Sequence, residues 1–555
     1  MKDTRMLGIQ LNRVATVIVL SLTALLFYER HTDASLHNRA NFNGVDSRVA
    51  QADKFAWDTI EPTEELIWKN CYSGNQCARL KVPLDYSNPG DASAAIAMVR
   101  LHSVVPHNST SYRGPVLINP GGPGGSGVDV VLGRGSMLAA ILGPEFDIIG
   151  FDPRGISRST PRVSFFETRA EREIWGAQLI VKSMNASTDA LPRAWARSLI
   201  TGQLAGERDK GSLRYINTDH TARDMLRIVQ AHGREKLQYW GFSYGSVLGA
   251  TFASMFPDNV ERLVIDGVAD SENYFATEWS NNLLDADKSW ASFMDGCAAA
   301  GPDGCPFYAP TASAISDKVN QIYASLRARP IPVRTNTSYG LVDYSMLRKV
   351  IFEGLYSPFA TSDAGNGTAL LQLAQRPAFE CGCDPAEFRF ESVGDAGTAV
   401  VCNDGKPISA KFEDAERHYR EVSRTSSWAD MWMTIRMPCS TWPDFPKDHF
   451  QGPFVANTSF PLLLVGNTAG LAKKMSKGFP GSVVLTQDSA GHCSISAPSL
   501  SPDTVCPVIG SPFPAADLND AADAQVVLAL SAADRSLLEV LRELAMSFDI
   551  RFPGL

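Results

Sequence analysis

One serine lies in a turn whose spacing is typical of an exposed nucleophile. Ser243 has Gly241 and Gly245 two positions away on either side, and the turn joins the apolar run 237–240 to the helix-like run 246–256. Small residues at these positions let a strand turn sharply into a helix, which lifts the serine hydroxyl clear of the sheet at the positive end of the helix dipole. The spacing predicts Ser243 as a nucleophile. The structural alternative is an ordinary small-residue turn.

A glycine-rich loop upstream could supply the donors that such a nucleophile needs. The apolar run 115–118 opens into this loop at 119–127. Acyl transfer requires N–H groups aimed at the developing oxyanion, and loss of one donor costs on the order of a hundredfold or more in rate. We assign the amides of Gly122 and Tyr244 to this oxyanion hole. The loop also matches the G-x-G-x-x-G dinucleotide pattern, which Pro123 and the position of the loop well inside the chain disfavour.

A histidine far downstream is the expected general base. His492 follows the apolar run 482–485 through the short loop 486–491, so it should lie just past a strand end. Histidine suits this role because its unperturbed pKa lies near neutral pH. His418, in a charged helical run, and His449, in a Pro/Asp-rich loop, are expected to be solvated surface residues. A serine–histidine mechanism needs no metal and no organic cofactor.

Together these motifs resemble the proline iminopeptidase and tripeptidyl aminopeptidase family of α/β-hydrolase serine peptidases. The order of oxyanion loop, serine and histidine along the chain is that of an α/β-hydrolase. The resemblance extends over most of the chain, and residues from about 428 onward resemble the C-terminal region of the tripeptidyl aminopeptidase branch. The motifs that carry it are 119–124, Asp152-Pro153-Arg154-Gly155, the turn at Ser243, Asp266-Gly267 and Ala490-Gly491-His492.

The resemblance implies an α/β-hydrolase fold: a mostly parallel central sheet with helices on both faces and an inserted, mainly helical lid. Alternating strand-like and helix-like runs support this expectation, with Thr218 as a candidate cap for a helix over 219–232. The expected divisions are a signal peptide or anchor at 1–30, a polar linker at 31–60, a core in two parts at 61–270 and 429–512, a lid at 271–428, and a linker and helix at 513–555.

The family resemblance also implies a substrate: a peptide with a free amino end. In such aminopeptidases the lid supplies carboxylates that hold the ammonium group of the substrate. The acidic residues that the lid region offers for this role are Glu272, Glu278, Glu353 and Asp363.

One departure from the family concerns the acid of the triad. The family places an aspartate in the loop after the strand that here is 461–466, but in this chain the loop is only 467–470 and holds no carboxylate. An Asp-to-Asn change in another triad lowers turnover about ten-thousandfold. Three explanations remain: Asp266 replaces the missing acid, Asp488 does so, or the segment was lost and the product is impaired. As a structural alternative, Asp266 caps the turn after its strand.

The leader and the cysteines indicate the secretory route. Lys2, Arg5 and Arg13 precede the uncharged run 14–28, which predicts a signal peptide or a retained membrane anchor with the body outside. Ten cysteines suit an oxidising compartment. The close spacings predict local bridges between Cys71 and Cys77 and between Cys297 and Cys305, whereas Cys493 is expected to pair with Cys506. Glycan acceptor sites occur at Asn108, Asn185, Asn336, Asn366 and Asn457.

Composition narrows the range of functions. A formal net charge of -9 and a pI near 5.6 argue against nucleic-acid binding as the main task. We therefore expect a serine peptidase that releases residues from the amino end of peptides. The alternatives are a secreted carboxylesterase or lipase with the same machinery, or a catalytically silent hydrolase fold that acts as a binding protein.

Overall fold

The structure is a computed structural model of the whole chain. It describes residues 55–495 except 73, 178–182, 306, 335–338, 357–392, 468–469 and 488. The chain divides into two units, Met1–Ala56 and Trp57–Leu555, and every element named below belongs to the second unit.

The core is a nine-stranded sheet in the order β1-β2-β3-β5-β4-β6-β7-β10-β11. β1, β2 and β3 are joined antiparallel, as is the β3–β5 pair, and all pairs from β5 to β11 are parallel. The bounds are β1 Lys69–Cys71, β2 Asn75–Pro83, β3 Ser93–Leu101, β4 Gly114–Asn119, β5 Phe146–Phe151, β6 Leu237–Phe242, β7 Val260–Asp266, β10 Leu463–Gly466 and β11 Val483–Thr486. The predicted mostly parallel α/β sheet is confirmed.

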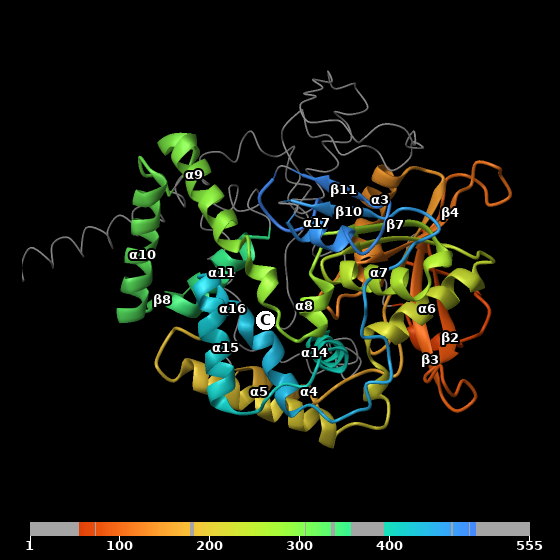
Figure 1. Cartoon of the computed structure of the whole chain (residues 1–555), viewed down its shortest axis with the longest axis horizontal. Helices are drawn as coiled ribbons and strands as arrows, with labels where there is room; N and C mark the ends of the chain where they lie inside the picture. Colours follow the sequence, from red (N-terminus) through yellow and green to blue (C-terminus); the bar gives the residue numbers. More distant parts are fainter. Residues whose placement is uncertain are drawn as a thin grey trace, which may run out of the picture. The chain divides into compact units, whose positions relative to one another are not determined.

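Helices between the parallel strands pack on this sheet and bury its central members (Figure 1). α3 (Gly127–Leu142) follows β4 and packs on β3 and β5, and α7 (Tyr244–Met255) follows β6 and packs on β6 and β7. α6 (Thr218–Ala231) packs on α7, and α17 (Gly470–Ser476) connects β10 to β11. Every residue of β4, β5 and β6 is buried, as expected for parallel strands covered by helices.

The predicted cap of α6 is wrong by one residue. Asn217 is the N-cap, and its side chain accepts a hydrogen bond from His220 N. Thr218 is instead the first helical residue, and its hydroxyl donates to Asp404 Oδ2 at 2.5 Å. The hydroxyl is therefore used for a long-range contact with the lid.

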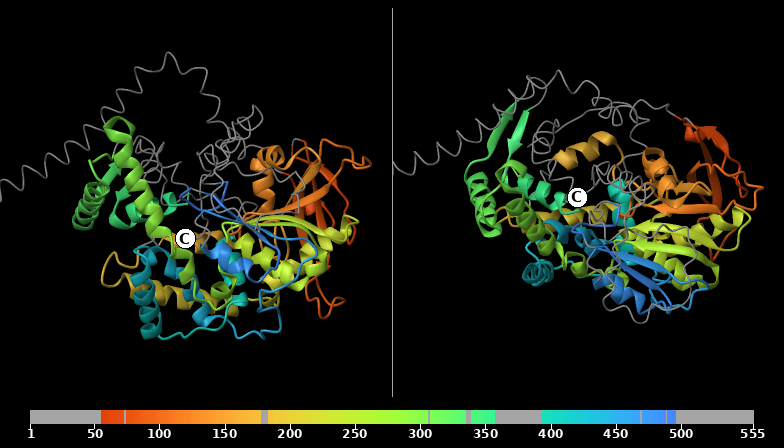
Figure 2. Two further views of the ribbon diagram at one scale, coloured as in Figure 1. Left: turned by 45° about the horizontal axis from the view of Figure 1, so that its top comes forward. Right: turned by 90° about the horizontal axis from the view of Figure 1, so that it is seen from above.

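Most lid helices lie between β7 and β10, beside the sheet (Figures 1 and 2). They are α8 Ser271–Phe275, η4 Ser280–Leu283, α9 Ala286–Gly304, α10 Ala312–Ala328, α11 Tyr344–Gly354, α14 Val393–Asp404, α15 Phe412–Thr425, α16 Ala429–Trp432 and η7 Met433–Thr441, with a small sheet of β8 Ile331–Arg334 and β9 Tyr339–Val342. Two helices from before β6 join them, α4 (Arg169–Ala177) and α5 (Ala190–Glu207). α5 packs against η7 and α15, so the helical layer also draws on the first part of the chain.

Disulfides fix both the sheet edge and the lid. Cys71–Cys77 and Cys297–Cys305 are bridged, which confirms the two predicted local pairs. A third bridge, Cys402–Cys439, joins α14 to η7 across 37 residues and was not expected from spacing. It links these two segments covalently.

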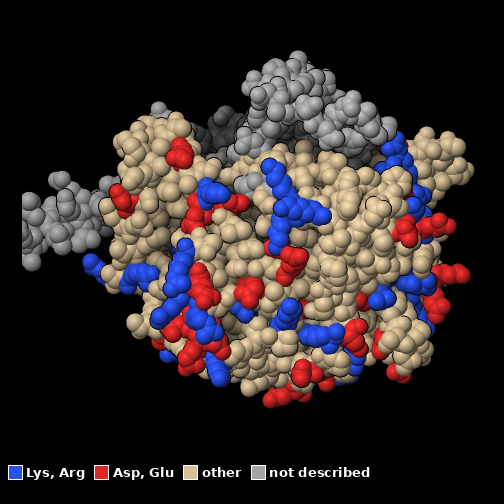
Figure 3. Space-filling view, in the orientation of Figure 1, with Lys and Arg blue, Asp and Glu red and all other residues tan. Residues whose placement is uncertain are grey.

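Several segments and residues for which the sequence makes predictions lie outside the described residues. These are the leader at 14–28, the linker and helix at 513–555, and residues Asn336, Asn366, Asp363, Asp488 and Cys506. Among the helices of the described part, none has both the length and the apolar character that a membrane crossing requires. The face of the molecule in Figure 3 shows basic and acidic side chains interspersed.

Candidate active site

Ser243 lies in a strained turn between β6 and α7. Its backbone has φ 58° and ψ -121°, a conformation that non-glycine residues rarely adopt and that is frequent at functional sites. Two hydrogen bonds hold the turn: Ser243 N donates to Asp266 O at 2.8 Å, and Ser246 N donates to Ser243 O at 2.8 Å. The first bond ties the turn to the end of β7. The sequence pattern predicted this strand–turn–helix geometry.

The glycine-rich loop presses directly against this turn. A Cβ on Gly121 would lie 2.8 Å from Ser243 Cβ and 3.0 Å from Tyr244 N, so only glycine fits there. The buried Asn119 shapes the loop, because its Oδ1 accepts Gly121 N at 3.0 Å. The loop thus brings Gly122, one of the two expected oxyanion donors, to the same cavity wall as Ser243 and the other expected donor, Tyr244.

A buried carboxylate anchors the far end of that loop. Asp152 Oδ1 accepts Ser126 Oγ at 2.5 Å and Val128 N at 3.2 Å, at the start of α3. Ser126 caps the helix by accepting Asp129 N at 3.0 Å. The Asp-Pro-Arg-Gly motif noted in the sequence therefore fixes the loop and lies outside the cavity lining.

His492 lines the same cavity as Ser243, although the two residues are far apart in the sequence. Its backbone N donates to Tyr356 O at 2.9 Å, and its ring meets the Tyr356 ring edge to face with centroids 5.2 Å apart. Burial disfavours the charged imidazolium and lowers the pKa of His492 to about 4. The ring is therefore neutral at physiological pH, the form that accepts a proton.

Asp266 lies at the end of β7 and contacts both the turn of Ser243 and Ser494, two residues after His492. Its backbone oxygen accepts Ser243 N, while its carboxylate accepts Ser494 N at 2.8 Å, Ser494 Oγ at 2.5 Å and Trp240 Nε1 at 3.3 Å. Burial raises the pKa of this carboxyl to about 6, against the opposing effect of the hydrogen bonds from Ser494. These bonds make Asp266 an anchor for the loop that carries His492.

The loop after β10, in which the family resemblance places the acid, begins with an amide, Asn467, and holds no carboxylate. Asn467 follows β10 and lines the cavity, and both of its side-chain polar atoms are buried without a hydrogen-bond partner among the described residues. Such a buried, unsatisfied group costs about 1–3 kcal/mol. The other candidate acid, Asp488, lies outside the described residues.

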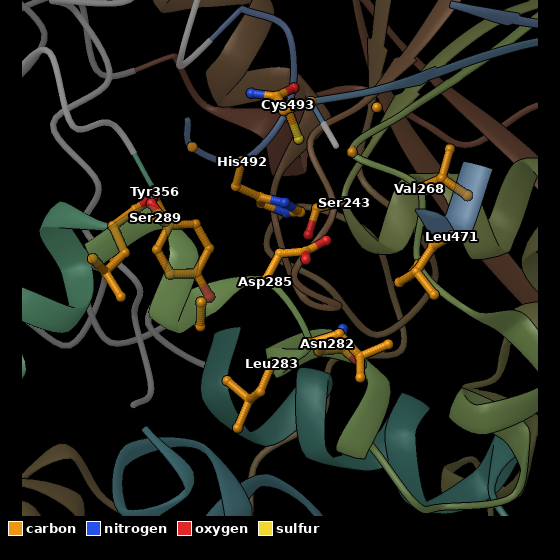
Figure 4. A pocket seen from close by; sticks show the side chains of 18 of the residues that line it. Ser243, Val268, Asn282, Leu283, Asp285, Ser289, Tyr356, Leu471, His492 and Cys493 are labelled. Atoms are coloured by element: carbon orange, nitrogen blue, oxygen red, sulfur yellow. The ribbon is translucent and has the colours of Figure 1, made fainter. Parts of the chain in front are cut away.

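The cavity has a volume of about 390 Å³ and lies between the sheet and the lid. The core contributes the turn, the glycine loop and the histidine loop, and the lid contributes a mainly apolar wall that includes Leu283, Phe352, Leu355 and Trp432. Figure 4 shows Ser243, His492 and Asp285 around the centre of this space.

Asp285 is the one carboxylate among the described residues that line the cavity. It is the N-cap residue of α9, its side chain makes no capping hydrogen bond, and its Oδ1 accepts a hydrogen bond from the exposed Lys288 Nζ at 2.7 Å. Nothing in the local sequence distinguishes it from the other acidic residues of the lid, so it was missed. The described lid carboxylates named from the sequence, Glu272, Glu278 and Glu353, do not line this cavity.

Those three carboxylates are instead paired elsewhere. Glu272 contacts Lys474 at 3.0 Å, and Glu353 contacts Lys349 at 3.6 Å. Glu278 Oε2 lies 3.4 Å from His418 Nδ1 in a second cavity of about 310 Å³. The expectation of a solvated His418 is therefore wrong, because only 15% of its side chain is exposed.

Comparison with protein families agrees with this geometry. A family described as alpha/beta hydrolase fold matches residues 114–302, which include the glycine loop and Ser243. A second, described as TAP-like protein, matches residues 425–504, which include His492.

Curated relatives cover most of the chain. Tripeptidyl aminopeptidase of Streptomyces lividans is 27% identical over 82% of this chain and 81% of its own length. Serine protease Hip1 of Mycobacterium tuberculosis is 27% identical over 68% of this chain and 75% of its own length. Carboxylesterase B of Mycobacterium tuberculosis is 26% identical over 76% of this chain and 81% of its own length. The sheet, the matched regions and these relatives show that the chain is a hydrolase with the α/β-hydrolase fold and a TAP-like C-terminal region.

Proposed function

We propose that this hydrolase is a serine peptidase that releases residues from the amino end of peptides. The observation that carries the proposal is Asp285, a carboxylate in the wall of the cavity that also holds Ser243 and His492. A peptide with a free amino end brings an ammonium group that Asp285 can pair with. The relatives named tripeptidyl aminopeptidase and serine protease support a peptide substrate.

In the proposed mechanism His492 takes the proton of Ser243 while the serine oxygen attacks the carbonyl carbon of the scissile peptide bond. The amides of Gly122 and Tyr244 donate to the oxyanion, and His492 then protonates the leaving amine. Water, activated by His492, hydrolyses the acyl-enzyme and frees the amino-terminal product. No step uses a metal or a cofactor.

The ion pair between Asp285 and Lys288 lies where solvent can reach it. The side chain of Lys288 is 76% exposed, and exposed pairs of this kind contribute about 0–1 kcal/mol. An ammonium group held inside the cavity is better shielded from water and can replace that lysine. Lys288 would then turn outward to solvent.

The test compares aminoacyl-naphthylamides that have a free or an acetylated amino group. The proposal predicts turnover of the free amine and little turnover of the acetylated form. Asp285→Asn should raise KM for the free amine by about tenfold or more, because a hydrogen bond to a charged group is worth about 1.5–3 kcal/mol. Lys288→Met is the matched control, and it should leave KM unchanged or lower it.

A carboxylesterase is the second candidate, favoured by the apolar lid wall and by the relative named carboxylesterase B. Short-chain naphthyl esters separate the two functions. Faster turnover of these esters than of any naphthylamide, with no effect of Asp285→Asn, would assign the cavity to esters. A folded protein that turns over neither substrate would be a binding protein.

We further propose that the chain enters the secretory route, cleaved or anchored by its leader. Support comes from the disulfides Cys71–Cys77, Cys297–Cys305 and Cys402–Cys439, and from exposed glycan acceptors at Asn108 and Asn457. Glycosidase treatment of the protein from its native host should lower its apparent mass, and the Asn108→Gln/Asn457→Gln variant should show a smaller shift. An identical mass before and after treatment would contradict export through a glycosylating compartment.

A further inference from the structure

Two histidines and an aspartate meet at the sheet, outside the catalytic cavity. His102 follows β3, His107 lies five residues further on in the same loop, and Asp147 is the second residue of β5. One potential ligand atom from each of the three lies within 4.8 Å of the others. His107 Nε2 is 3.1 Å from each carboxylate oxygen of Asp147.

These distances are close to those of a metal site. Nitrogen and oxygen ligands bind Zn²⁺ at about 2.0–2.2 Å in tetrahedral geometry, which places two ligand atoms about 3.3 Å apart. The His107–Asp147 pair already has nearly this separation. The ligand atom of His102 lies within 4.8 Å of the other two, so it must move closer to bind the same ion.

The carboxylate is held in place by hydrogen bonds of its own. Asp147 is buried, and its oxygens accept Ser103 N at 2.7 Å and Tyr112 OH at 2.8 Å. Such bonds orient the ligands of a metal centre. Ser103 Oγ in turn lies within hydrogen-bond distance of two acceptors, Val105 O at 2.8 Å and Pro144 O at 3.0 Å, and accepts Val105 N at 2.9 Å, which fixes the backbone between the two histidines.

The residues in and around the His102–His107–Asp147 cluster indicate which kind of metal ion it would bind. Arg100 Nη1 lies 3.6 Å from Asp147 Oδ2 and offsets much of the negative charge. Ca²⁺ and Mg²⁺ bind through several oxygen ligands, so this cluster offers them little. Imidazole nitrogen is a preferred ligand of Zn²⁺ and Cu²⁺.

We propose that His102, His107 and Asp147 form a binding site for a divalent transition metal, with Zn²⁺ as the leading candidate. His107 is 43% exposed and His102 is exposed, so an ion can reach the site from solvent. Asp147 lies near the start of β5, whereas the catalytic loops follow the ends of parallel strands. A bound ion would therefore tie the loop after β3 to β5 and stabilise the fold without entering the reaction.

The experiment measures Zn²⁺ binding to the chelator-treated protein by titration calorimetry, together with its thermal unfolding. The proposal predicts a site that binds Zn²⁺ but not Mg²⁺ or Ca²⁺, and a higher unfolding temperature with Zn²⁺. His102→Ala/His107→Ala should lose this binding and the thermal shift. Tyr112→Phe should weaken binding by about 10–100-fold, the usual cost of removing an outer hydrogen bond to a ligand.

His418→Gln is the matched control, since it removes a histidine outside the cluster and should leave Zn²⁺ binding unchanged. Absence of Zn²⁺ binding to the wild type would overturn the proposal. Equal affinity of the wild type and the double-histidine variant would also overturn it, because the ion would then lie elsewhere.

Discussion

Ser494 donates two hydrogen bonds to Asp266, from its backbone N to Oδ1 at 2.8 Å and from its hydroxyl to Oδ2 at 2.5 Å. The same aspartate accepts Ser243 N through its backbone oxygen at 2.8 Å. One residue at the end of β7 therefore holds both the turn of the nucleophile and the loop of the histidine. We infer that Asp266 is a positioning residue that acts on His492 through Ser494.

This relationship gives the first prediction, for Ser494→Ala. Loss of the hydroxyl removes one of the two bonds and leaves the carboxyl in place, so kcat should fall about tenfold while KM changes little, because a hydrogen bond to a charged group is worth about 1.5–3 kcal/mol. Asp266→Asn should cause a larger fall. Steady-state kinetics on the free aminoacyl-naphthylamide measure both. A normal kcat in Ser494→Ala with an inactive Asp266→Asn would instead make Asp266 the direct acid of the triad.

The second prediction concerns pH. Burial favours the neutral ring and lowers the pKa of His492 to about 4, so the base should remain unprotonated well below the usual histidine range. The acid limb of the kcat/KM profile should lie near pH 4 instead of near 6.5. A fall in kcat/KM centred near pH 6.5 would contradict this expectation and show that a negative partner raises the pKa of His492 in the free enzyme.

The third prediction concerns the contact between the lid and the oxyanion loop. Gly397 of α14 lies so close to this loop that an added Cβ would be 2.5 Å from Pro123 O, next to Gly122. Gly397→Ala should displace the loop and lower kcat by roughly ten- to a hundredfold, up to the cost of one lost oxyanion donor.

Gly296→Ala is the control for that variant. Gly296 is also a lid-helix glycine, but no atom lies within 4 Å of a Cβ placed there. It should keep full activity and gain up to about 1 kcal/mol of helix stability. Equal activity of Gly397→Ala and Gly296→Ala, measured below both unfolding midpoints, would show that α14 does not support the loop.

The fourth prediction concerns the missing acid. Asn467 lines the cavity after β10, where the family resemblance places the triad carboxylate. Asn467→Asp should raise kcat by at least tenfold, within the roughly ten-thousandfold that a triad aspartate provides, and should shift the acid limb upward because a carboxylate raises the pKa of the histidine. Asn467→Leu should give no gain. An unchanged kcat and pH profile in Asn467→Asp would place the acid elsewhere.

The sequence predicted the parts of the site that depend on local backbone chemistry. Ser243 and the glycine loop each follow a buried apolar strand, and His492 follows the apolar, partly exposed edge strand β11. The parallel order of β4, β6 and β11 places the loops that follow them at one edge of the sheet. The strand bounds are within a few residues of those expected, because buried parallel strands are continuous apolar runs.

The sequence could not predict contacts made between distant segments. Thr218 has the residue type of a helix cap, but Asp404, 186 residues away, accepts its hydroxyl. Asp285 lines the cavity because it lies between η4 and α9, two lid segments that border the cavity. The residues next to Asp285 in the sequence form no motif that would have indicated this. His418 is half-buried because Glu278 and Arg436 pack around it.

The most direct test of the account is covalent labelling of the folded protein by an organophosphonate, with the labelled residue located by mass spectrometry. The strained turn and the adjacent imidazole should make Ser243 the labelled residue in the wild type. Ser243→Ala should not be labelled, and His492→Ala should be labelled much more slowly. Labelling of a different residue, or equal rates in the wild type and His492→Ala, would contradict the proposed nucleophile and base.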